Sequence, residues 1–248
     1  MWAGLMRDLM GVSDPLAQAM RFHTQTAGST LTAQQPLTNV VRTTVQAMAA
    51  VLGGTQSLHT NAYDEALGLP TEDSARLALR TQQILAYESG MGDTVDPFGG
   101  SYFIESLTDE VEAAATELFD RVEAMGGAVA AIEAGFMQSQ IEESAYTEAR
   151  AQGSGQSVVV GVNRFASDAS EPTEVLRVDP NLEAGQCRRL AEWRQARGSV
   201  DSHLQAIADT AKGTDNLLPV IKEALATGAT VGEVSETLRD VFGTYRPA

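Results

Sequence analysis

The sequence predicts an α/β fold that begins with one strand–helix–strand unit and continues as a mostly helical chain. Two short strand-like segments, residues 20–28 (MRFHTQTAG) and 55–60 (TQSLHT), flank a single strong helical pattern. Polar side chains gather where each segment ends. From residue 101 onward the chain has helical periodicity, except for one valine-rich stretch at residues 157–163. A strand–helix–strand order is typical of a parallel sheet, in which the loops after the strands' carboxyl ends carry the chemistry.

Residues 36–52 predict the helix that connects the two strands. Pro36 suits the first helical position, because its fixed φ and missing N–H cost nothing there. Gly53 and Gly54 end the helix, since glycine accepts the left-handed conformation at a helix C-terminus. Apolar and small side chains recur at spacings of three and four and predict one core-facing stripe. The stripe consists of Leu37, Val40, Val41, Thr44, Val45, Met48 and Leu52.

Capping residues and glycines mark the other helices. Residues 1–13 predict a short amphipathic helix that stops at Gly11. Thr71 is suited to cap a helix that runs to Tyr87, because its hydroxyl can accept from a free N–H of the first turn. Further helices are predicted over 109–125, 128–134 and 137–151, the first of them capped by Thr108. Residues 182–246 are predicted to be all-helical, and the last helix of this region begins with a capping box from Thr230 to Glu233.

One apolar stretch and one polar stretch interrupt the helical part. Residues 157–163 (SVVVGVN) are rich in valine and predict a short buried strand. Residues 166–180 are polar and contain proline, which is typical of a surface linker. We therefore expect a strand-containing region over 1–100 and a mainly helical extension over 101–248.

The composition excludes several classes of function. The chain has 33 acidic and 17 basic residues and a net charge of −16, so its surface repels nucleic acids and anionic membranes. No apolar run approaches the roughly 20 residues of a membrane span, and no signal peptide is recognisable. Cys187 is the single cysteine, which excludes an internal disulfide and a cysteine zinc site. We expect a cytoplasmic protein with no nucleic-acid or membrane partner.

The polar residues at the strand ends are the candidates for a binding site. His23 and Gln25 occupy alternate strand positions, so both side chains point to the same side. His59 and Asn61 repeat this arrangement at the end of the second strand. The repetition favours hydrogen bonding to a substrate or cofactor, although a histidine satisfied within a core is the alternative. A metal site made from the two histidines and Glu65 is disfavoured, because separate strand ends do not fix the ligand geometry.

Longer motifs resemble a known enzyme family. Residues 21–83, 95–112 (VDPFGGSYFIESLTDEVE), 125–145 and 158–165 (VVVGVNRF) are similar, in the same order, to the large catalytic subunit of the methylmalonyl-CoA mutase family of adenosylcobalamin-dependent acyl-CoA mutases. The resemblance covers nearly the whole chain. It implies the C-terminal portion of a (β/α)₈ TIM barrel, with residues 1–100 as its last two β/α units, followed by a mostly α-helical extension. The implied activity is radical isomerisation of the carbon skeleton of an acyl-CoA.

The resemblance also assigns site residues. It implies that the substrate- and cofactor-binding residues are His23, Gln25, Gly28, Asn61, Glu65 and Ala66. His23 and Gln25 would lie beside the corrin and the substrate, and Gly28 would let the corrin approach closely. The Glu65 carboxylate suits the ribose hydroxyls of the adenosyl group. Ser29 departs from the larger residue expected there, and no residue of this chain is assigned as catalytic or as a metal ligand.

The motifs that the chain lacks define its expected partners. The first six barrel strands have no counterpart, and neither has the D-x-H-x-x-G motif whose histidine ligates cobalt. Adenosylcobalamin would therefore need a cobalamin-binding domain or subunit, and the acyl-CoA substrate would need a partner that carries the missing strands. The chain alone is expected to expose apolar faces and to form an oligomer. The alternatives are a non-catalytic truncated paralogue that acts as an assembly or interaction module, and an incomplete reading frame.

Overall fold

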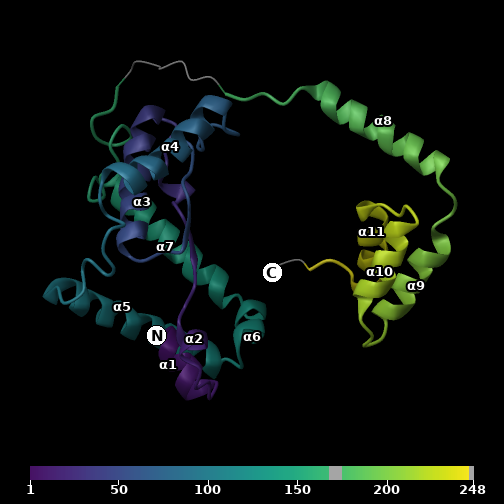
Figure 1. Cartoon of the computed structure of the whole chain (residues 1–248), viewed down its shortest axis with the longest axis horizontal. Helices are drawn as coiled ribbons and strands as arrows, with labels where there is room; N and C mark the ends of the chain where they lie inside the picture. Colours follow the sequence, from purple (N-terminus) through teal and green to yellow (C-terminus); the bar gives the residue numbers. More distant parts are fainter. Residues whose placement is uncertain (168–174, 246–248) are drawn as a thin grey trace. The chain divides into compact units, whose positions relative to one another are not determined.

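The protein is described here by a computed structural model that covers residues 1–167 and 175–245 (Figure 1). The chain divides into two compact units, Met1–Leu176 and Arg177–Ala248. This division differs from the boundary expected at residue 100, since residues 101–176 group with the strand-containing unit. The domain assignment itself stays a prediction. The linker expected over 166–180 includes residues 168–174, which lie outside the described residues.

The first unit contains a small parallel sheet. Strand β1 (His23–Gln25) pairs with strand β2 (Ser57–His59), with Gln25 opposite His59. Both the α/β class and the parallel strand–helix–strand unit are thereby confirmed. The connection between the strands runs through two short 3₁₀ turns, Gly28–Thr30 and Pro36–Thr38, and then through helix α3 (Asn39–Leu52).

Helix α3 buries a different face from the one that its apolar stripe predicted. The buried residues are Asn39, Thr43 and Ala47, each four positions apart. Val41 and Val45, at the centre of the predicted stripe, are 65% and 54% exposed. The predicted apolar face is therefore covered only in part, since other members such as Val40 and Met48 are half-buried. The physical reason is that α3 lies against the loops that follow β1 and β2, which offer backbone carbonyls to its polar side chains.

Helix α4 (Glu72–Glu88) packs beside the second strand. Thr71 caps it as predicted, because its Oγ1 accepts from a first-turn N–H at 3.2 Å. Farther along the helix, Gln82 Nε2 donates to the Leu58 carbonyl at 3.1 Å and to Thr60 Oγ1 at 3.0 Å. These contacts fix β2, and the loop that follows it, against a long helix.

Helix α5 (Tyr102–Ala124) begins earlier than the sequence predicted. Ser101 is its N-cap, and Thr108 lies inside the helix, where its hydroxyl donates to the Ile104 carbonyl at 2.7 Å. A threonine inside a helix makes this bond to the preceding turn, so the residue type alone did not distinguish a cap from an interior position. The other helices of the first unit are α1 (Trp2–Gly4), a π-helical turn over Leu5–Leu9, α2 (Pro15–Gln18), α6 (Ala128–Glu133) and α7 (Phe136–Gly153).

The short strand expected over 157–163 does not form, so this prediction is wrong. The chain makes a turn there that is closed by one isolated bridge between Val160 and Arg164. Gly161 has a left-handed φ of 82°, a conformation that favours glycine. The side chain of Asn163 accepts from Val159 N and donates to the carbonyls of Ser157 and of Gln152, near the end of α7. Turn chemistry therefore overrides the strand preference of the valines.

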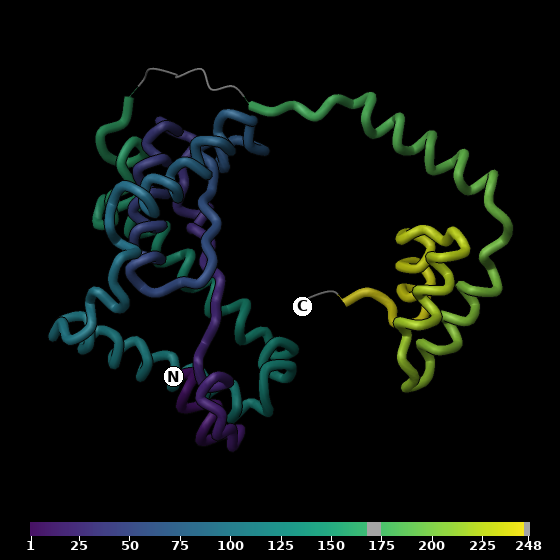
Figure 2. The backbone as a smooth tube through the Cα atoms, in the orientation of Figure 1, coloured from purple at the N-terminus to yellow at the C-terminus, as the bar shows by residue number. Residues whose placement is uncertain are grey.

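All regular secondary structure in the described part of the second unit is helical, as predicted for residues 182–246 (Figure 2). None of the helices in the described ranges of the whole chain is long and apolar enough to cross a membrane. The core of the unit consists of Val200, Ile207, Ala224, Ala229 and Val234. Its helices are α8 (Pro180–Ala196), α9 (Asp201–Ala211), α10 (Leu217–Ala226) and α11 (Val231–Phe242).

The predicted capping box at the start of α11 is present and is joined to the end of α8. Thr230 Oγ1 accepts from Glu233 N at 3.3 Å, and Glu233 Oε2 accepts from Thr230 N at 2.9 Å. The Arg197 guanidinium also donates to Glu233 Oε2 at 2.7 Å. Hydrogen bonding by Arg197, followed by Thr230, lowers the pKa of Glu233 to about 2.

We expect the second unit to be less stable in acid, because the Glu233 carboxylate then becomes protonated. The pKa of Glu233 is lower in the folded state, about 2, than its ordinary value of 4.5, so folding favours the ionised form. The stabilisation is complete above the unfolded pKa and is lost as the pH falls towards 2. Glu233→Gln should remove this pH dependence and cost about 1–2 kcal/mol at pH 7.

Urea denaturation at pH 7 and at pH 3 measures the effect. Glu236→Gln is the matched control, because Glu236 lies exposed on the same helix and pairs with Arg239. An equal change of unfolding free energy with pH in the two variants would contradict the assignment to Glu233.

Candidate functional site

Hydrogen bonds continue past the two strands and align the residues that follow them. Thr26 N donates to the His59 carbonyl at 3.0 Å. Asn61 N then donates to Thr26 Oγ1 at 2.9 Å. The two segments therefore stay side by side beyond β1 and β2, so the loops that leave the carboxyl ends of the strands start from a common edge.

Four of the predicted site residues meet at this edge. Gln25 Nε2 donates to Asn61 Oδ1 at 3.2 Å. A Cβ atom placed on Gly28 would lie 2.8 Å from Asn61 Nδ2 and 3.5 Å from Glu65 Oε1. We call Gln25, Gly28, Asn61 and Glu65 the strand-end cluster. It presents two carboxamides and one carboxylate around a glycine.

The other two predicted site residues lie outside the strand-end cluster. His23 is exposed, and its Nδ1 lies 2.7 Å from Ser57 Oγ across the sheet, which argues against the alternative of a core histidine. Ala66 is exposed one position beyond Glu65. Among the described residues, no group of three or more His, Cys, Asp or Glu side chains is placed to hold a metal ion.

Asn61 has a buried donor without a partner. Its residue is 3% exposed, and its Nδ2 has no hydrogen-bond partner among the described residues. Buried amide groups are nearly always hydrogen-bonded, so an orphaned one marks a place for a water molecule, a ligand or another chain. This donor faces the space that the missing Cβ of Gly28 leaves open. Together with Glu65, it suits a ligand that carries hydroxyl groups at close range.

A small cavity adjoins the strand-end cluster. It has a volume of about 220 Å³ and is bounded by His59 and Glu65 on one side and by helix α4 on the other. His59 is itself exposed, as His23 is. His23 and His59 are therefore both exposed on the sheet. His59 borders the small cavity, whereas His23 contacts Ser57.

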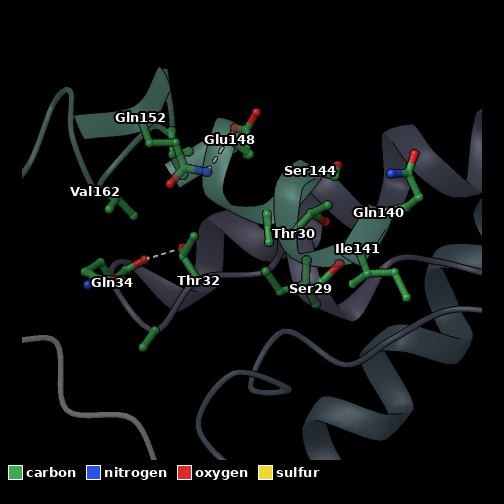
Figure 3. A pocket seen from close by; sticks show the side chains of 14 residues that line it. Ser29, Thr30, Thr32, Gln34, Gln140, Ile141, Ser144, Glu148, Gln152 and Val162 are labelled. Carbon is green, nitrogen blue, oxygen red and sulfur yellow. Dashed lines mark hydrogen bonds between the residues drawn. The ribbon is translucent and has the colours of Figure 1, made fainter. Parts of the chain in front are cut away.

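A larger groove begins where the loop after β1 leaves the sheet (Figure 3). Its volume is about 1110 Å³. One wall is residues 29–34, and the other wall is helix α7, which contributes Gln140, Ile141 and Ser144 to the lining (Figure 3). Sequence reasoning missed the α7 wall, because residues 136–153 look like an ordinary polar surface helix. Only the three-dimensional contact with the loop reveals it.

Comparison with known proteins finds relatives that match almost the whole chain. The sequence pattern of the family described as methylmalonyl-CoA mutase matches residues 1–244. The 2-hydroxyisobutanoyl-CoA mutase large subunit of Aquincola tertiaricarbonis is 44% identical over 251 residues, which cover 99% of this chain and 44% of that protein. The methylmalonyl-CoA mutase of Escherichia coli K12 is 44% identical over 239 residues (95% and 33%), and the human mitochondrial enzyme is 40% identical over 250 residues (99% and 33%).

The chain spans between a third and less than half of the length of these relatives. The matches nevertheless cover almost all of this chain, including both compact units and the strand-end cluster. Identity at this level over so many residues does not arise by chance. The chain therefore belongs to the methylmalonyl-CoA mutase family.

Proposed function

We propose that this chain supplies the last two β/α units, and the helical region that follows them, of an adenosylcobalamin-dependent acyl-CoA mutase. The observation that carries the proposal is the strand-end cluster. Its residues lie at the carboxyl ends of two parallel strands, the edge at which barrel enzymes place their ligands. The reaction would be the isomerisation of the carbon skeleton of an acyl-CoA.

The residues of the cluster fit a cofactor that carries ribose hydroxyls and a flat, bulky ring. The Glu65 carboxylate would accept from hydroxyl groups, and the orphaned Asn61 Nδ2 would donate to an oxygen. Gln25 orients the Asn61 carboxamide through its 3.2 Å hydrogen bond, and Gly28 leaves room for close approach. When bound, adenosylcobalamin supplies the one-electron chemistry that the side chains lack. His23 and Ala66 would complete the surface around this cofactor.

The unpaired edges of the two-stranded sheet indicate which further partners the chain needs. Within the described residues, β1 and β2 pair only with each other, so each has a free edge. Free edges and the exposed Val41 and Val45 of α3 favour further barrel strands and helices from a partner polypeptide. A cobalamin-binding domain or subunit would supply the cobalt ligand. We place this assembly in the cytoplasm, and the acidic charge disfavours nucleic-acid and membrane partners.

Reconstitution tests the proposal. The chain is mixed with a polypeptide that carries the other six barrel strands, a cobalamin-binding protein, adenosylcobalamin and an acyl-CoA. We expect isomerised acyl-CoA, detected by chromatography, because the cluster then faces a complete barrel. Glu65→Gln should lower turnover at least about tenfold, since loss of a charged hydrogen bond costs roughly 1.5–3 kcal/mol.

Glu117→Gln is the matched control for this test, because Glu117 lies exposed on α5. Its turnover should equal that of the unmodified chain. Stable complexes without turnover in any combination would contradict the enzymatic proposal and favour the alternative of an assembly module. Equal loss in the two glutamate variants would separate the activity from the cluster.

A further inference from the structure

We propose that Asn39 is a positioning residue that sets the spacing between the two halves of the strand-end cluster, with its carboxamide held in place by Arg42. This inference rests on the proposed function of the cluster as a cofactor site. Asn39 escaped the sequence analysis, because it lies at the start of α3 and outside the apolar stripe. In the structure it is fully buried, with 0% of its surface exposed.

The Asn39 carboxamide joins the loop after β1 to the loop after β2. Its Nδ2 donates to the Thr32 carbonyl and to the Tyr63 carbonyl, each at 2.8 Å. Its Oδ1 accepts from Thr32 N at 3.1 Å. Thr32 belongs to the segment that follows β1, and Tyr63 belongs to the segment that follows β2. One side chain therefore fixes the distance between two loops that are far apart in the sequence.

That distance is the one on which the cluster depends. Thr32 lies four positions after Gly28, and Tyr63 lies between Asn61 and Glu65. The approach of Gly28 to Asn61 is already so close that a single added carbon would come within 2.8 Å of Asn61 Nδ2. A shift of either loop by a fraction of an ångström would change the shape of the cluster. Asn39 is thus a connection that acts on the cofactor site without touching it.

Arg42 fixes the orientation of the Asn39 carboxamide. One guanidinium nitrogen of Arg42 donates to Asn39 Oδ1 at 2.7 Å and to Thr32 Oγ1 at 3.1 Å. A carboxamide turned over would place its NH₂ group against this cation, so the observed orientation is enforced. The other guanidinium nitrogen donates to the Val160 carbonyl at 2.7 Å. Arg42 therefore anchors the carboxamide to the turn at 158–165, a third part of the unit.

Asn39→Asp tests the proposal with little change of shape. Aspartate keeps the acceptor that faces Arg42 but removes the two donations, to Thr32 and to Tyr63. In the reconstituted enzyme we expect adenosylcobalamin affinity, measured by visible absorption, to fall about tenfold. The KM for acyl-CoA should change less than twofold, because the substrate would be held by the partner's strands.

A second measurement uses the full chain alone and needs no cofactor. The backbone N–H of Glu65 donates to the Ala62 carbonyl at 3.2 Å, within the loop that Asn39 holds. We expect Asn39→Asp to speed hydrogen exchange at Glu65 N at least about tenfold, while exchange in helix α4, for example at Ala75 N, stays unchanged. A general loss of stability would instead speed exchange at both positions.

Asn216→Asp is the control for the added negative charge. Asn216 lies in the second unit, where its Oδ1 accepts from Leu218 N at 2.9 Å. It should leave cofactor affinity and exchange at Glu65 N unchanged. Equal effects of the two variants, or no effect of Asn39→Asp on exchange at Glu65, would overturn the proposal. If the unmodified enzyme binds no adenosylcobalamin, the proposed function fails while the exchange result still decides the role of Asn39.

Discussion

Gly28→Val is expected to weaken adenosylcobalamin binding in the reconstituted enzyme by at least about a hundredfold, or roughly 2.8 kcal/mol. The reason is steric. The first added carbon alone would stand 2.8 Å from Asn61 Nδ2, and the two methyl groups of valine would extend farther towards Glu65. Asn61 is 3% exposed and cannot swing into solvent without giving up its bond from Gln25. Equilibrium titration followed by visible absorption measures the loss.

The backbone does not confound this test. Gly28 lacks a left-handed φ, so a side chain there brings no conformational strain of its own. Gly92→Val is the matched control, because Gly92 also lacks a left-handed φ and has nothing within 4 Å of its hypothetical Cβ. Its affinity should equal that of the unmodified enzyme. Tight binding by the Gly28 variant would show that the space beside Asn61 is not used by the cofactor.

Ile207→Ala is expected to destabilise the second unit by about 2–5 kcal/mol, since truncating a buried aliphatic side chain loses its burial and leaves a cavity. Ile207 is 0% exposed at the centre of the cluster formed by α9, α10 and α11. In a unit of this size each kcal/mol lowers the thermal midpoint by several degrees. We therefore expect the midpoint to fall by roughly 10 °C or more.

Trp193 reports this transition selectively. Its Nε1 donates to the Gly228 carbonyl at 3.0 Å within the second unit, while the other tryptophan, Trp2, lies in the first unit. Fluorescence in a Trp2→Phe background follows the second unit alone. Leu218→Ala is the control, because Leu218 is 71% exposed on α10. An unchanged midpoint for Ile207→Ala would mean that these three helices do not share one cooperative core.

Local chemistry made some features predictable and hid others. The caps at Thr71 and Thr230 were predictable, because a cap satisfies N–H groups of its own first turn. The buried face of α3 was not, because Asn39 and Thr43 are buried by hydrogen bonds to distant loops rather than by apolar packing. The prediction that Thr108 caps a helix was wrong for a related reason. A threonine hydroxyl inside a helix donates to a preceding carbonyl as readily as it accepts from a first-turn N–H at a helix start.

The candidate site likewise has a part that was predictable from the sequence and a part that was not. Strand alternation placed Gln25 and Asn61 at one edge, and the family resemblance added Gly28 and Glu65, and these four meet in the structure. The link through Asn39 depends on contacts between residues 24 positions apart, which no local pattern encodes. The turn around Gly161 was not predictable either, because the left-handed φ of Gly161 outweighed the strand preference of the valines.

The open edges of the two-stranded sheet have a consequence for biosynthesis. An unpaired edge offers backbone donors and acceptors that any extended segment can satisfy, whatever its side chains. Two copies of this chain can therefore pair edge to edge and aggregate before other strands cover these edges. If the proposed partner polypeptide supplies the other barrel strands, synthesis of both polypeptides at the same place and in equal amounts would favour assembly, whereas surplus copies of this chain would aggregate or be degraded.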